Sequence, residues 1–139
     1  MKRFHLIFGI VILVVFALTG QYMHRYLNHL EGMPDGLRMM YRTRHIFILL
    51  AGLVNLALAA YVVPRPARWQ RVLQWIGSSL IVLATLLFVA GFVYDSPRTD
   101  LSAPLSYRGV FAIAYGGVFH LISGIGARSK QRNNESASS

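Results

Sequence analysis

The 139-residue chain contains no cysteine and few charged residues, and both shortages narrow what it can be. Without cysteine it has no disulfide bridges, thiolate metal sites, iron–sulfur clusters or cysteine-anchored lipids. Charged residues make up 14% of the sequence, whereas soluble domains carry about 25%. Hydrophobic residues make up 55%, and the mean hydropathy is +0.47. A water-soluble globular domain is therefore nearly excluded.

Acidic residues are especially scarce, with 5 Asp and Glu against 14 Lys and Arg. None of them lies within the long apolar stretches, which excludes a carboxylate-driven pump or a paired-acid hydrolase. The sequence also lacks the phosphate-binding P-loop, the H-E-x-x-H zinc motif and the G-x-S-x-G nucleophile motif. The sequence therefore favours a protein that is not an enzyme, and it assigns no catalytic residue and no metal site.

Four apolar stretches cover residues 4–23, 45–63, 72–94 and 109–127. Each is close to the ~20 residues that a helix needs to cross ~30 Å of hydrocarbon. In lipid every backbone N–H and C=O must be paired internally, so stretches of this length should be helices. Short connections make successive helices antiparallel. We therefore predict an all-α integral membrane protein, an up-down-up-down four-helix bundle within one domain, 1–127, and a disordered polar tail, 128–139.

The basic residues predict how the helices are oriented, because cytoplasmic loops are enriched in Lys and Arg. Six lie on the side opposite the N-terminus, and eight on the same side as it: Lys2, Arg3, Arg65, Arg68, Arg71, Arg128, Lys130 and Arg132. The three arginines between 65 and 71 strengthen this bias. We expect a multi-pass protein of the cell membrane (inner or plasma) with both termini cytoplasmic. Because the basic residues are divided between both faces, nucleic-acid binding is not expected.

The connection between the first two apolar stretches contains one turn signal, 31–36. Two helices that continue up to this turn would form a projecting hairpin, with His24 and His45 within about one turn of each other. Arg38, Arg42 and Arg44 surround them. Imidazoles from two helices can ligate haem iron, and arginines can hold the propionates, so haem b is a candidate cofactor.

The same five residues also suit a quinone or an anionic lipid head group. The plainer interpretation is that histidine and arginine at an interface contact water and phosphates. Asp95 and Asp100, in the other outer loop, are candidate partners for Arg42 and Arg44, and such pairs would orient the two hairpins against each other. Exposed ion pairs contribute only ~0–1 kcal/mol.

Polar residues deep in a membrane are costly and are therefore stronger indications of function. Counted from the outer ends of the stretches, Asn55, Thr85 and His120 fall near the bilayer centre. Small residues at helical spacing flank Asn55 and His120, and such stripes let helices approach closely. We therefore predict a direct or water-bridged hydrogen bond between Asn55 and His120. This pair either fixes helix register, or His120 acts as a proton relay or cofactor ligand, or the pair contacts a substrate. We expect His5 to contact lipid head groups.

The sequence favours a non-catalytic accessory, assembly or interaction protein in the lipid bilayer, paired with another membrane protein or with its own copies. One alternative is a haem- or quinone-binding electron-transfer protein. The second is an oligomeric transporter or channel, because four helices in one copy leave little room for a pore.

Overall fold

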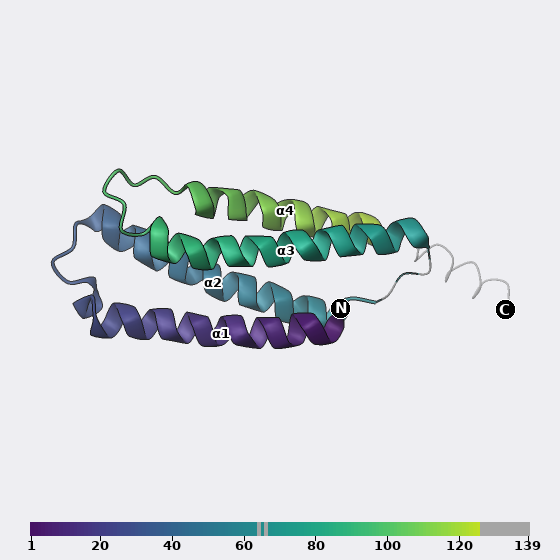
Figure 1. Ribbon diagram of the computed structural model, residues 1–139, viewed down its shortest axis with the longest axis horizontal. Helices are drawn as coiled ribbons and strands as arrows, with labels where there is room; N and C mark the ends of the chain where they lie inside the picture. Colours follow the sequence, from purple (N-terminus) through teal and green to yellow (C-terminus); the bar gives the residue numbers. More distant parts are fainter. Residues whose placement is uncertain (64, 66, 126–139) are drawn as a thin grey trace, which may run out of the picture.

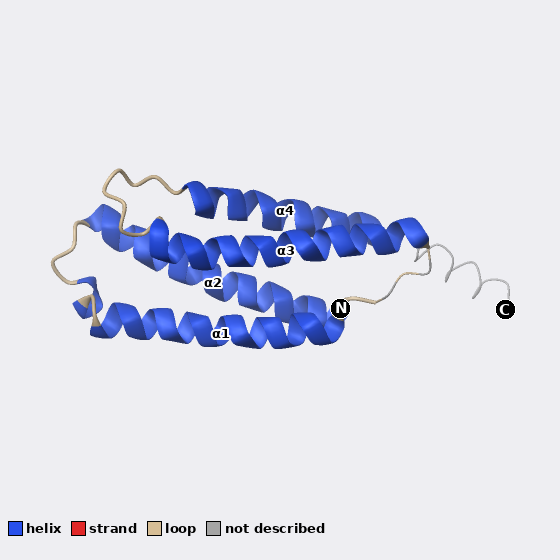
Figure 2. Cartoon of the chain, in the orientation of Figure 1, coloured by secondary structure: helices blue, strands red, loops and turns tan. Residues whose placement is uncertain are grey.

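The computed structural model describes residues 1–63, 65 and 67–125, and within these ranges all regular structure is helical (Figure 2). The elements are α1 (Lys2–Arg25), the short 3-10 segment η1 (Asn28–Leu30), α2 (Asp35–Tyr61), α3 (Arg68–Tyr94) and α4 (Pro104–Gly124). The four α-helices are long and apolar enough to cross a membrane. The predicted all-helical fold with four candidate spans is confirmed, and the predicted tail, 128–139, lies outside the described residues.

The helices are antiparallel to their neighbours in sequence (Figure 1). One end of the molecule, here called the N-terminal end, holds Met1 and the connection from α2 to α3. The opposite, distal end holds the connections 26–34 and 95–103. α1 packs on α2 and α3 packs on α4, and these two helical hairpins meet through α2 and α3.

Glycine allows the close helix crossings within each hairpin. A Cβ at Gly77 would lie 2.8 Å from the carbonyl oxygen of Gly116, and a Cβ at Gly116 would lie 2.8 Å from that of Gly77. In the other hairpin, a Cβ at Gly9 would lie 3.2 Å from the Gly52 carbonyl oxygen. Small residues at these crossings permit backbone approach, as is common between membrane helices.

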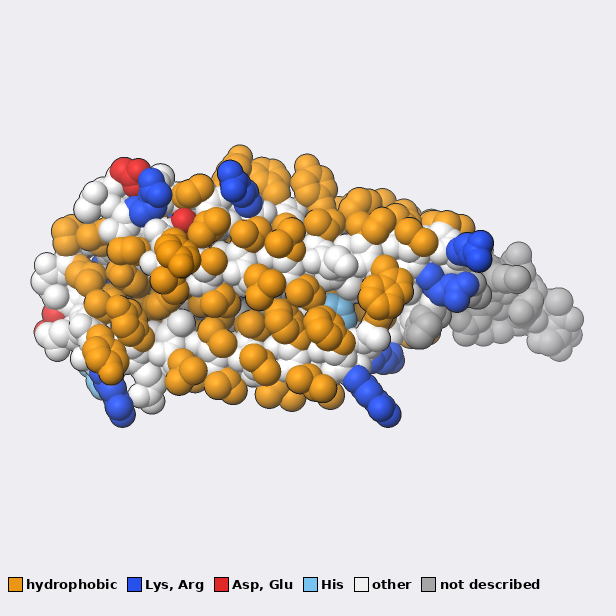
Figure 3. Space-filling view, in the orientation of Figure 1, with side chains coloured by type: hydrophobic (Ala, Val, Ile, Leu, Met, Phe, Trp, Pro, Cys, Tyr) orange, Lys and Arg blue, Asp and Glu red, His pale blue; other side chains and the backbone are white. Residues whose placement is uncertain are grey.

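The face of the molecule shown in Figure 3 is apolar over most of its length, and basic side chains gather toward its two ends. Burial is uneven among the helices. Over an apolar stretch of 18 residues in each helix, 44% of the residues of α3 are buried but only 11% of those of α1. α3 is therefore the central helix, and α1 lies at the edge of the assembly.

The predicted hairpin between the first two helices is only half helical. α2 begins at Asp35, well before His45, as predicted, but α1 ends at Arg25. Three consecutive residues then adopt the left-handed conformation, Asn28 at φ 43°, His29 at φ 55° and Leu30 at φ 65°. This conformation costs roughly 1–2 kcal/mol per residue outside glycine. Leu30 is 3% exposed within the hydrophobic core, and its burial offsets part of that cost.

Two glutamines of α3 bind the ends of the neighbouring helices. Gln74 Nε2 donates to the Val63 carbonyl oxygen at 2.8 Å, just beyond α2, and Gln70 Nε2 donates to that of Ile125 at 3.1 Å, just beyond α4. Carbonyl groups at a helix C-terminus have no intrahelical partner, so these amides satisfy acceptors that would otherwise be unpaired. Both glutamine side chains are buried.

Candidate functional site

Five polar side chains form one hydrogen-bonded network that joins all four helices. His5 of α1 is central: its Nδ1 lies 2.8 Å from Asn55 Oδ1 of α2, and its Nε2 lies 3.0 Å from Ser78 Oγ of α3. Ser78 Oγ also lies 3.2 Å from His120 Nε2 of α4. Asn55 Nδ2 donates to Thr85 Oγ1 at 3.1 Å. A chain of contacts therefore runs from α4 through α3 and α1 to α2 and back to α3.

The chemistry of the donors and acceptors assigns a direction to this network. Asn55 Nδ2 donates to the Ala51 carbonyl oxygen and to Thr85, so its Oδ1 is the acceptor facing His5. If both imidazoles are neutral, His5 carries its proton on Nδ1 and accepts the Ser78 hydroxyl hydrogen bond at Nε2. The Ser78 oxygen is left to accept from His120, which carries its proton on Nε2. Every contact is satisfied with both imidazoles neutral.

The network is enclosed by protein. Asn55 and Thr85 are 0% exposed and His5 is 1% exposed, while His120 is half-buried. Two predictions are corrected by these contacts. The direct Asn55–His120 hydrogen bond is wrong, because His5 and Ser78 stand between the two residues. The expected head-group contact of His5 is also wrong, because its ring is buried and both its nitrogens bind protein atoms.

The sequence contained a signal for His5 that depth counting from the outer ends missed. His5 lies in the first turn of α1, and Asn55 lies within about two turns of the last residue of α2, Tyr61. Counting from the N-terminal end of the bundle therefore brings them to similar levels. Ser78 gives no such signal, because a serine in an apolar helix often bonds its own backbone.

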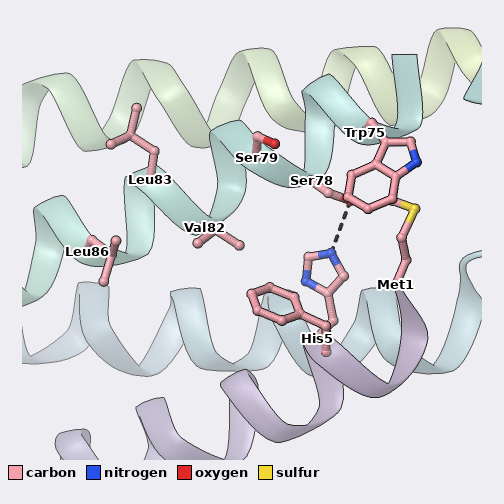
Figure 4. A pocket seen from close by; sticks show the side chains of 9 residues that line it. Met1, His5, Trp75, Ser78, Ser79, Val82, Leu83 and Leu86 are labelled. Carbon is pink, nitrogen blue, oxygen red and sulfur yellow. Dashed lines mark hydrogen bonds between the residues drawn. The ribbon is translucent and has the colours of Figure 1, made fainter. Parts of the chain in front are cut away.

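Beside this network lies a lateral groove between α1 and α3 with a volume of about 450 Å³ (Figure 4). Its walls are mostly apolar, and the side chains with hydrogen-bonding groups are His5, Trp75, Ser78 and Ser79. Figure 4 shows the His5 ring pointing from α1 toward Ser78, with Trp75 and Met1 close by. The lining residues are Met1, Phe4, His5, Trp75, Ser78, Ser79, Val82, Leu83 and Leu86. We call this space the α1/α3 groove.

At the distal end the two predicted imidazoles have different partners. His45 Nδ1 lies 2.9 Å from Thr19 Oγ1, and its ring stacks on Phe16 at a centroid distance of 4.0 Å. His24 Nδ1 instead lies 3.2 Å from His29 Nδ1. The sequence did not predict this pair, because the left-handed turn at 28–30 carries no recognisable motif. The cofactor role of His24 and His45 stays a prediction.

The three predicted arginines also separate. Arg38 donates to the Met33 carbonyl oxygen at 3.1 Å and pairs with Asp35 at 3.3 Å. Arg42 lines a cavity of about 230 Å³ with Gly20, Met23, His24, His29 and Leu30. Arg44 is 6% exposed, and its Nη1 donates to the Met40 carbonyl oxygen at 3.5 Å. Of the five predicted residues, His24 and Arg42 line this cavity, whereas Arg38, Arg44 and His45 hydrogen-bond to other groups.

Asp95 attracts Arg44 electrostatically, as predicted, but no direct salt bridge joins Arg42 or Arg44 to Asp95 or Asp100 among the described residues, and both carboxylates hydrogen-bond locally. Asp95 Oδ2 accepts from the Ser106 N–H at 2.8 Å and from its hydroxyl at 2.9 Å, and so caps the first turn of α4. Asp100 pairs with Arg98 at 3.1 Å and accepts from Ser102. The hydrogen bond from Arg98 holds the pKa of Asp100 well below its usual range, with smaller contributions from the Ser102 N–H and hydroxyl. Partners close in sequence thus take both carboxylates.

In the part of the chain that the structure describes, no three His, Cys, Asp or Glu side chains come together as metal ligands. No protein-family model, curated protein or solved structure matches this chain. The α1/α3 groove and the network that borders it are the features from which a function can be argued.

Proposed function

We propose that the protein is a non-catalytic integral membrane protein, with both termini cytoplasmic, that holds a lipophilic small molecule of the quinone class in the α1/α3 groove. The observation that supports this proposal is a mostly apolar groove with a few hydrogen-bonding groups among its lining side chains. Small-molecule sites have this composition and volumes of roughly 300–1,000 Å³. The groove, at about 450 Å³, lies within that range.

The side chains of the groove favour a flat ring with carbonyl groups over a plain acyl chain. Phe4 and Trp75 line the groove and are 54% and 62% exposed, so their rings are open to a ligand. Aromatic rings of this kind pack well against another flat ring. The Ser79 hydroxyl, also exposed on the groove wall, is a donor for a carbonyl oxygen. The apolar wall formed by Val82, Leu83 and Leu86 suits a hydrocarbon tail.

The direction of the network supports a binding role over proton transfer. Protons can pass between imidazole and hydroxyl groups, which links His120, Ser78 and His5. The chain then reaches Asn55, whose amide does not exchange a proton readily with its neighbours. Beyond it, the Thr85 hydroxyl donates to the Ile81 carbonyl oxygen at 2.8 Å. The network therefore serves to hold the groove wall in one arrangement.

Fluorescence of the purified chain tests this proposal. In a Trp69→Phe background, Trp75 is the single tryptophan, and a short-chain benzoquinone should quench it saturably. Ser79→Phe, which fills the groove, should abolish saturation. Ser79→Ala should weaken binding by about 2–10-fold, the worth of one hydrogen bond.

The matched control is Val72→Phe, an exposed position of α3 that does not line the groove. It should leave the titration unchanged. Quenching that rises without saturation, or that is equal in Ser79→Phe, contradicts quinone binding in the groove.

A second candidate, an assembly role, is favoured by the low burial of α1. In this role α1 packs against a second copy of the chain. Because the chain has no cysteine, Val14→Cys on the exposed face of α1 should give a disulfide-linked dimer in membranes. Val118→Cys on the exposed face of α4 is the control and should remain monomeric. Equal cross-linking at both positions would contradict association through α1.

A further inference from the structure

The imidazole rings of His24 and His29, at the distal end, face each other through their Nδ1 atoms. The ring centroids of His24 and His29 are 4.0 Å apart, whereas their Nδ1 atoms are 3.2 Å apart. Both Nδ1 atoms therefore lie on the facing sides of the rings. The planes meet at 73°, so the rings are not stacked. Both side chains are exposed, and water or an ion can reach the pair.

This separation matches two imidazoles that bind one metal ion. Imidazole nitrogens lie ~2.0–2.1 Å from a bound metal, so two of them at a tetrahedral angle are about 3.3 Å apart. The observed distance of 3.2 Å differs little from this value. Without metal, one Nδ1–H donates to the other Nδ1. For an ion to bind between them, that proton shifts to Nε2 of the same ring, so that both Nδ1 lone pairs face the ion.

A thioether lies in the same cavity. Met23, which precedes His24, lines the cavity of about 230 Å³ together with both imidazoles and Arg42. We propose that His24, His29 and Met23 form a binding site for a soft monovalent metal ion, Cu(I). The site lies at the distal end, so it is independent of the α1/α3 groove and of any ligand bound there.

The composition of the cavity selects among metals. Thioether and imidazole ligands favour Cu(I), whereas Mg²⁺ and Ca²⁺ require oxygen ligands. No carboxylate lines the cavity, and Arg42 places a positive charge on its wall. That charge repels a dication more strongly than a monocation, since the Coulomb energy scales with the charge of the ion. His29, whose backbone is left-handed, lies with its Nδ1 3.2 Å from Nδ1 of His24 at the end of α1.

Copper binding to the full-length chain in detergent tests the site. The protein is titrated with Cu(I), kept reduced by ascorbate, in competition with a chromogenic Cu(I) chelator. One ion should bind per chain. His24→Ala and His29→Ala should each weaken Cu(I) binding by at least about 10–100-fold. Losing a group that only hydrogen-bonds to a metal ligand already has an effect of this size. Met23→Leu should weaken Cu(I) binding while leaving Zn²⁺ binding unchanged, which isolates the thioether.

The matched control is His45→Ala, since His45 lies on α2 against Phe16 and Thr19 and not in this cavity. It should bind Cu(I) as the unaltered chain does. Helical circular dichroism checks that each variant is folded. The proposal is overturned if the unaltered chain does not compete with the chelator for Cu(I). It is also overturned if the double variant His24→Ala/His29→Ala binds Cu(I) as tightly as the unaltered chain. It is also overturned if Zn²⁺ binds more tightly than Cu(I), or if the cavity takes inorganic phosphate through Arg42 and no metal.

Discussion

The two ends of the molecule use histidine in opposite ways. Near the N-terminal end, His5 is 1% exposed and has both ring nitrogens bound to side chains on other helices. At the distal end, His24 and His29 are exposed and contact each other through one nitrogen each. The first arrangement lies on regular helices, and the second depends on three left-handed residues. A buried imidazole whose contacts are complete stabilises packing, whereas an exposed pair with open nitrogens is available to a ligand.

The largest loss of stability should come from a substitution at the crossing of α3 and α4 beside His120. In Gly116→Ala the added Cβ would lie 2.7 Å from Ile81 Cγ1 and 2.8 Å from the Gly77 carbonyl oxygen. Relief requires α3 and α4 to separate, so the free energy of unfolding should fall by about 1–3 kcal/mol. Thermal unfolding in detergent measures the loss. Gly117→Ala is the matched control, because its Cβ would meet nothing within 4 Å. Equal stability of the two variants would contradict the tight crossing.

Removing the Asn55 amide from the network should lower the free energy of unfolding by less than Gly116→Ala does. Asn55→Leu leaves the His5 Nδ1–H without an acceptor and Thr85 without a donor. Interhelical hydrogen bonds in membrane proteins average only ~0.6 kcal/mol, with a maximum of about 1.7. Because two are lost, we expect a decrease of about 1–2 kcal/mol in the free energy of unfolding. Ala57→Leu, on the exposed face of α2, should change it little. A stable Asn55→Leu variant would mean that the network does not hold the helices together.

At the distal end, a substitution should raise the free energy of unfolding instead of lowering it. His29→Gly relieves a left-handed conformation that costs a non-glycine residue roughly 1–2 kcal/mol, while glycine loses more backbone entropy. We expect a net gain of up to about 1 kcal/mol in unfolding free energy, although the histidine pair is lost. His5→Gly should destabilise the chain in the same assay. If both variants lose stability, the contrast between the two ends is wrong.

The smallest effect should come from the exposed distal loop. The Arg98 hydrogen bond lowers the pKa of Asp100 from its ordinary value of 3.8. A lowered pKa in the folded state stabilises the fold above the ordinary value, and this contribution disappears as pH falls through the lowered pKa. Melting temperatures of the unaltered chain and Asp100→Asn should therefore differ slightly at pH 7, and the difference should shrink as pH falls from the ordinary pKa of 3.8 toward the lowered pKa. A difference that grows on acidification would contradict the sign.

The sequence predicted the helices well because their cause is local. Runs of apolar residues near ~20 in length have to be helical in lipid, whatever their partners. The beginning of α2 at Asp35 agreed with the turn signal before it. The end of α1 at Arg25 differs from the prediction, which continues this helix up to the turn signal. The left-handed turn at 28–30 is held by the burial of Leu30, which is a long-range contact.

The candidate sites were harder to predict because they depend on which helix faces which. Asn55 and His120 were identified as polar residues in apolar surroundings, and both belong to the network. The two residues between them are His5 and Ser78, and the place of His5 near the start of the chain predicts the interface instead. His24 was paired with His45 on the assumption of two straight helices. The structure instead gives it a neighbour five positions away, His29.

The arrangement of the chain as two hairpins joined through α2 and α3 has a consequence for how it can be divided. A break in the connection between Tyr61 and Arg68 separates α1 and α2 from α3 and α4 without cutting a helix. The two fragments, produced together, should reassociate into a folded complex, with His5 and Ser78 re-forming their contact across the junction. Split-chain complementation of this kind would let each half be labelled or varied by itself.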